Sequence, residues 1–212
     1  MRSGSRSTVL SVDLDVGAAP STASWAERVA ALCAAWYPLV HALLESPGYT
    51  PPSRIVLRMV PTIGDGRRSP GTPGVTSGTV ITVGADWVRL HPEDTGLVLH
   101  ELVHVVQSYP SGEPWWLTEG VADWVRYQRV ETSDPRARPD VAGRSYNEGY
   151  GVTAAFLEWI QVTCSVPLVA VLNAAMRRGA WYPRLVDETV GIGLDELWRR
   201  FVAERGPALR TR

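Results

Sequence analysis

The chain has 212 residues, of which 45% are hydrophobic and 20% charged, and its formal net charge is −1. This length and composition suit one globular domain with a hydrophobic core. The near-neutral charge argues against a nucleic-acid partner, and the sequence has no apolar run of about 18 residues that could span a membrane. The two cysteines, Cys33 and Cys164, lie in apolar contexts and are expected to be buried thiols rather than a disulfide or a metal pair.

The N-terminus predicts a cytoplasmic protein. It carries Arg2 and Arg6 but lacks the apolar stretch of about 7–15 residues that a signal peptide needs. We expect Met1–Ser7 to be a flexible tail and residues 8–207 to form a single domain. Nothing in the sequence indicates the oligomeric state.

The first half of the chain predicts a small sheet with a long helix. Alternating apolar residues predict three strands, at Thr8–Val16, Arg54–Val60 and Gly78–Gly84. Ser24–Leu44 has an apolar stripe at helical spacing, which Pro38 should kink or break. Pro61–Ser77 is rich in glycine and proline and is expected to be a mobile loop, and Ala85–Leu90 is expected to be a short helix.

The next helix carries the sequence His100-Glu101-Leu102-Val103-His104, an instance of the HExxH zinc-protease signature. Asp94 or Thr95 should cap this helix, and Pro110 lies just past its end. Positions four apart share one face of a helix, so His100 and His104 can direct two imidazoles at one cation. Glu101 stands beside the first of them, placed to hold the attacking water and take its proton.

A second helix should follow a turn-rich connection, with Thr118 as its N-cap. Glu119 and Asp123 are one turn apart on it, and Glu119 lies fifteen residues after His104. Glu119 is therefore the candidate third ligand of a catalytic zinc site, which has three protein ligands and one open position. Asp123 can accept the N–H of a ligating histidine and fix its tautomer. The alternative for Glu119 is a first-turn acid favoured by the helix dipole.

The rest of the chain predicts helices and completes an α+β plan. Glu131–Gly143 should be a polar loop, followed by helices at Tyr146–Val162, Pro167–Arg178 and Leu194–Glu204. The fold class is thus α+β, with a small N-terminal sheet and a helical half after it in a single domain.

HExxH followed by ExxxD resembles the gluzincin metallopeptidases. Within them, three stretches look like the basic secretory protein family, a peptidase-like family of plants with bacterial members. They are Leu97–Gln107 (LVLHELVHVVQ), Pro114–Arg126 (PWWLTEGVADWVR) and Gly149–Trp159 (GYGVTAAFLEW). The resemblance covers about 150 residues and implies a zinc-dependent peptidase acting on peptides or proteins. It also implies a zincin-like fold, with the small N-terminal sheet packed on the HExxH helix. By the same resemblance, secretion is the alternative to a cytoplasmic location.

The resemblance also implies an oxyanion donor, since charge builds on the former carbonyl oxygen during hydrolysis. Tyr146 and Tyr150 are the candidates. Related gluzincins favour Tyr146, which we take as the first candidate, whereas the basic secretory proteins share the position of Tyr150 more clearly. Thr79–Val83 could be an edge strand that binds an extended peptide, or an ordinary core strand. Trp115 and Trp116 could wall the cleft or belong to the core.

Two other functions fit the same residues. One is a binding or defence module that retains zinc for stability, although the intact Glu101 argues against it, because a structural site needs four ligands and no base. The other is a zinc hydrolase of a non-peptide amide.

Overall fold

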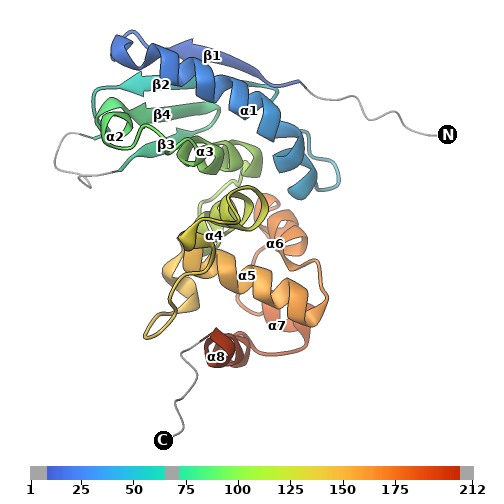
Figure 1. The fold of residues 1–212 in the computed structure, drawn as a ribbon. Helices are drawn as coiled ribbons and strands as arrows, with labels where there is room; N and C mark the ends of the chain where they lie inside the picture. The colour runs from blue at the N-terminus through green and yellow to red at the C-terminus, as the bar shows by residue number, and fades with distance from the viewer. Residues whose placement is uncertain (1–8, 65–71, 206–212) are drawn as a thin grey trace, which may run out of the picture. The chain divides into compact units, whose positions relative to one another are not determined.

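The computed structural model describes residues 9–64 and 72–205 (Figure 1). The expected tail Met1–Ser7, part of the expected loop Pro61–Ser77 and the last residues of the expected domain lie outside the described residues. The described chain is α+β, with a mixed four-stranded sheet and eight α-helices.

The chain divides into two compact units. Unit 1 comprises the described part of Met1–Leu43 together with Gly48–Ser108, and unit 2 comprises Leu44–Pro47 and the described part of Tyr109–Arg212. Unit 1 holds the sheet and unit 2 is helical, as the α+β plan predicts. The single domain stays a prediction.

The sheet of unit 1 has the strand order β1-β2-β4-β3. Its strands are β1 (Ser11–Asp15), β2 (Arg54–Val60), β3 (Gly74–Ser77) and β4 (Val80–Gly84). β1, β2 and β4 run parallel, and β3 pairs antiparallel with β4. The three predicted strands are confirmed, but the loop predicted at Pro61–Ser77 is wrong at its end, which forms β3. A tight turn at Gly78 and Thr79 lets these four residues pair with β4, a contact that local composition does not reveal.

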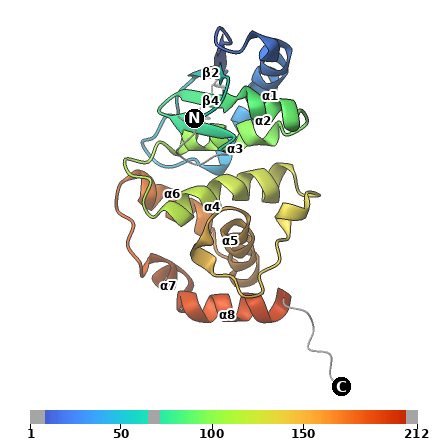
Figure 2. The ribbon, with the colours of Figure 1, turned by 90° about the vertical axis from the view of Figure 1, so that its left-hand side faces the viewer.

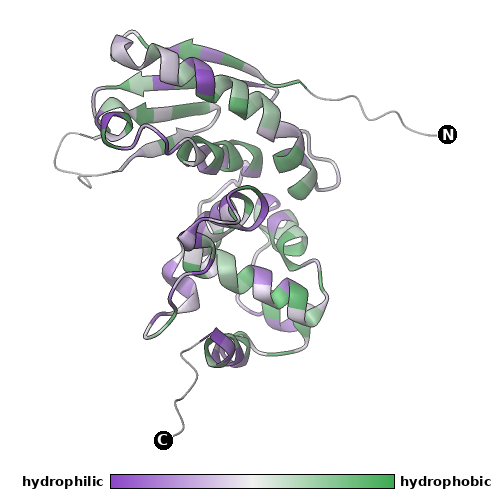
Figure 3. Cartoon of the chain, viewed as in Figure 1, coloured by the Kyte–Doolittle hydropathy of each residue, from purple (hydrophilic) through white to green (hydrophobic). Residues whose placement is uncertain are grey.

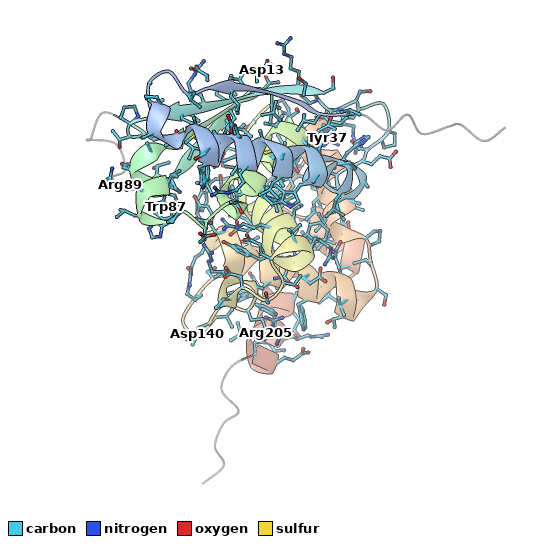
Figure 4. All side chains as sticks on the ribbon, turned by 45° about the horizontal axis from the view of Figure 1, so that its top comes forward. Asp13, Tyr37, Trp87, Arg89, Asp140 and Arg205 are labelled. Atoms are coloured by element: carbon cyan, nitrogen blue, oxygen red, sulfur yellow. The ribbon has the colours of Figure 1, made fainter. Side chains whose placement is uncertain are left out.

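Helices cover one face of this sheet. α1 (Ala23–Leu43) and α3 (Gly96–Gln107) pack against each other and against the strands (Figure 1). β2 alternates in burial, with Ile55, Leu57 and Met59 in the core. On its other face Arg54 pairs with Asp13, which is half-exposed and is labelled in Figure 4.

Two details of these helices differ from expectation. α1 continues through Pro38, so the predicted break is wrong: the helix gives up one hydrogen bond there, and its buried residues Tyr37 and Val40 hold it in place. α2 (Ala85–Leu90) forms as predicted, and α3 begins after Thr95 without a side-chain cap. The Asp94 carboxylate instead accepts the indole N–H of Trp87, which Figure 4 labels on α2.

Unit 2 is built around α5 (Tyr150–Cys164), which Figure 2 shows nearly end-on with α4 (Trp115–Val125) on one side and α8 (Leu194–Arg205) on the other. A π-helical turn, η2 (Arg126–Val130), extends α4. The remaining elements are the 3-10 helices η1 (Pro20–Thr22, in unit 1), η3 (Pro135–Ala137) and η4 (Tyr146–Glu148), and the helices α6 (Leu168–Arg177) and α7 (Leu185–Val190).

The helix predicted at Tyr146–Val162 is wrong at its start. Gly149 adopts φ 75° and ψ −167°, which separates η4 from α5. Only a residue without a Cβ takes this conformation readily, so the glycine ends one helix and begins the other. The other predicted helices of this half form within a few residues of their expected bounds.

Hydropathy follows burial along these elements. α3 and α5 are largely hydrophobic, whereas α8 is largely hydrophilic (Figure 3). Among the described residues, no helix combines the length and the apolar character needed to cross a membrane.

Candidate metal centre

α3 brings the two histidines of the HExxH sequence together within unit 1. The Nε2 atoms of His100 and His104 lie 3.0 Å apart, and the two rings meet edge to face with centroids 4.7 Å apart. Two imidazoles at this distance share a proton or direct both lone pairs at one cation. Imidazole nitrogen is a preferred ligand of zinc and similar ions, so the donor pair fits a transition metal.

Gln107 fixes the orientation of the second histidine. Its amide oxygen lies 2.7 Å from Nδ1 of His104, and its side chain is buried. An amide oxygen only accepts hydrogen bonds, so Nδ1 carries the hydrogen and Nε2 keeps its lone pair. Gln107 was not predicted as a site residue, although its spacing of three residues from His104 on an apolar helix was a usable signal.

Glu101 is buried on the same helix, beside β3. The Thr76 hydroxyl lies 2.7 Å from Oε2 of its carboxylate. Of the two alternatives for Thr79–Val83, the edge strand is wrong and the core strand is confirmed: β4 lies inside the sheet between β2 and β3, and β3 is the strand at the end of the order. β3, rather than β4, is therefore the edge beside the HExxH helix.

Glu119 and Asp123 lie one turn apart on α4, in unit 2, and Asp123 is buried. The predicted N-cap at Thr118 is wrong, since α4 begins at Trp115, whose N–H donates to the Glu113 carboxylate at 3.1 Å. The Thr118 hydroxyl donates instead to the carbonyl of Gly112.

The candidate metal-ligating set among the described residues is His100, His104 and Glu119. Two imidazole nitrogens and one carboxylate oxygen are the donors of many three-ligand catalytic zinc sites. In chemical terms the residues present therefore fit zinc.

The two candidate tyrosines have different surroundings within unit 2. The Tyr146 ring packs against Trp116, Phe156 and Trp198. Burial raises the pKa of Tyr146, and the charges of Asp195 and Asp187 raise it further.

Tyr150 is half exposed and meets the Trp115 ring edge-on. It follows Gly149, whose backbone lies against Trp115 and Glu119: a Cβ there would be 3.0 Å from the Trp115 ring and 3.6 Å from Cβ of Glu119. Tyr150 also has a φ of 48°, a conformation that costs a non-glycine residue on the order of 1 kcal/mol or more and recurs at functional sites. Of the two tyrosines, Tyr150 is the one that directly follows the glycine lying against Glu119.

A family model described as "Peptidase of plants and bacteria" (BSP) matches residues 69–201. This range contains β3 and the helices α3, α4 and α5, and so it includes the residues described above. No curated protein matches the chain, and no solved structure matches it.

Proposed function

Because the chain belongs to the BSP family, the peptidases of plants and bacteria, we propose that it hydrolyses peptide bonds with one zinc ion held by His100, His104 and Glu119 in a zincin-like, gluzincin-type domain. The family implies a peptide or protein substrate. The observation that carries the zinc proposal is the convergence of two imidazole Nε2 atoms next to a buried carboxylate on one helix. The HExxH and ExxxD patterns support Glu119 as the third ligand.

Glu101 is the general base of this proposal. Bound zinc would supply a Lewis acid that polarises the scissile carbonyl and makes water more acidic. Glu101 takes a proton from the attacking water as the new C–O bond forms. It then gives this proton to the amine nitrogen as the C–N bond breaks.

Each histidine needs a partner that sets its tautomer. Gln107 accepts the Nδ1–H of His104, so this nitrogen is already engaged. We therefore assign Asp123 to His100. The buried position of Asp123, one turn after Glu119, supports this role.

Tyr150 is our candidate for the second donor to the oxyanion. The sequence favoured Tyr146, but the Tyr146 ring is held in an aromatic cluster with acidic groups nearby. The exposed Tyr150 beside the Trp115 ring suits a group that meets substrate. An extended substrate would pair its main chain with the edge strand β3.

The decisive experiment combines metal analysis with digestion of a peptide library by wild type and Glu101→Gln. We expect about one zinc per chain in both proteins, and activity at least ~10²-fold lower in the variant, because the amide cannot accept the proton. Glu119→Ala should lose zinc. Full zinc content in Glu119→Ala would remove it from the ligand set. Zinc without peptide hydrolysis in wild type would favour a binding module or a hydrolase of another amide.

A further inference from the structure

We propose that Thr76 and Gly74 of β3 are positioning residues that hold the Glu101 carboxylate in its working orientation. The inference rests on the proposed role of Glu101 as general base. All three residues belong to unit 1. The strand that carries the two positioning residues was expected to be loop, and neither residue was predicted to belong to the site.

Thr76 fixes one oxygen of the carboxylate. Its hydroxyl lies 2.7 Å from Oε2 of Glu101 and 3.0 Å from the backbone carbonyl oxygen of the same residue. A hydroxyl has one proton to donate, and a hydrogen bond to a charged oxygen is shorter and stronger than one to a neutral oxygen. The carboxylate is therefore the better acceptor. The strand contacts both the main chain and the side chain of Glu101, which ties the carboxylate to the sheet.

Gly74 leaves room for the other oxygen. It lies two residues before Thr76, so the two share the face of β3 that is turned toward α3. A Cβ at position 74 would lie 3.1 Å from Oε1 of Glu101, 3.2 Å from its Cγ and 3.0 Å from Cδ1 of Leu97. Any side chain there would press on the carboxylate. The strand thus holds Oε2 by a hydrogen bond and leaves Oε1 uncrowded for proton transfer.

Kinetics of three threonine variants test the positioning role. Thr76→Val keeps the shape but removes the donor, whereas Thr76→Ser keeps it. Thr82→Val is the matched control, because Thr82 pairs with Val75 in the same sheet and so lies on the other face. We expect Thr76→Val to lower kcat about tenfold or more with little change in KM and unchanged zinc content, because a hydrogen bond to a charged group is among the strongest that a hydroxyl makes. Thr76→Ser should restore kcat to within about threefold, and Thr82→Val should match wild type. Equal kcat in Thr76→Val and Thr82→Val would overturn the inference.

A second readout is independent of zinc and of hydrolysis. Urea unfolding of the metal-free protein, in a double-mutant cycle of Thr76→Val with Glu101→Ala, measures the coupling of the two side chains. We expect Thr76→Val to change the unfolding constant about three- to tenfold more in wild type than in the Glu101→Ala background. Absence of coupling would overturn the inference even in an active enzyme. Coupling in a wild-type protein that cleaves no peptide would instead refute the proposed function, and the positioning role with it.

Discussion

Gly120 of α4 packs against Thr153 of α5, and Gly120→Ala should destabilise unit 2. A Cβ at this position would lie 2.3 Å from Cγ2 and 2.7 Å from Cβ of Thr153. Both distances are far shorter than van der Waals contact, and Cβ of Thr153 is not at the end of a flexible side chain. Alanine in a helix gains up to about 1 kcal/mol over glycine. Overpacking a buried helix contact costs typically about 1–3 kcal/mol, occasionally more. The steric overlap places the cost of overpacking near the upper end of this range, so the net loss of folding stability should be about 2 kcal/mol.

Thermal and urea unfolding measure this effect. For a protein of this size a loss of about 2 kcal/mol lowers Tm by roughly 4–8 °C. Thr153→Ser removes Cγ2 but keeps the hydroxyl that donates to the carbonyl of Tyr146, so it should recover part of the loss in the double variant. Gly112→Ala is the control, since nothing lies within 4 Å of its added Cβ. A Gly120→Ala protein as stable as wild type would refute the close packing of α4 on α5.

Three further predictions concern single side chains. Gln107→Leu should weaken zinc affinity roughly 10–100-fold in a chelator competition, whereas Gln107→Glu, which keeps an acceptor for His104, should weaken it less. Burial alone would raise the pKa of Glu158, but hydrogen bonds from Arg129 and Trp124 outweigh it and hold the pKa below its usual 4.5. The stability that the ionised Glu158 carboxylate contributes is therefore present above pH 4.5, and it is lost as pH falls through the pKa of Glu158 in the folded protein. In Glu158→Gln, Tm should therefore depend less on pH. Burial raises the pKa of Cys33 to about 12, so at pH 8 a thiol reagent should modify Cys164 and reach Cys33 only after denaturation.

The periodicity of apolar residues predicted most of the helices and strands, because most of them bury one face. The strands β1, β2 and β4 and the helices α1, α3 and α6 were found this way. β3 was missed because its four residues sit among glycines and prolines, and its pairing with β4 decides its structure. The helix predicted to run without interruption from Tyr146 is broken at Gly149, whose positive φ overrides the apolar pattern around it.

The residues of the candidate site also divide into those that local sequence patterns predict and those that they do not. His100, Glu101 and His104 follow from spacing within one helix turn, and Gln107 could have been added by the same rule. Thr76 could not, because it reaches Glu101 across 25 residues of sequence and through a strand pairing. Spacing rules predict side chains that lie on the same helix or strand, whereas a partner on another element is known only from the tertiary structure.

The four residues Leu44–Pro47 belong to unit 2 although they interrupt the sequence of unit 1. The buried amide of Asn173 donates to the carbonyl of Leu44 at 3.0 Å, and Arg177 donates to the same oxygen and to Ser46. The chain therefore passes from one unit to the other three times, after Leu43, Pro47 and Ser108. A truncated gene starting at Tyr109 would express α6 without the acceptor for that amide, leaving a desolvated donor unsatisfied. To express unit 2 on its own, Leu44–Pro47 would have to be joined to its C-terminal portion, either as an added tetrapeptide or by a circular permutation that keeps the two together.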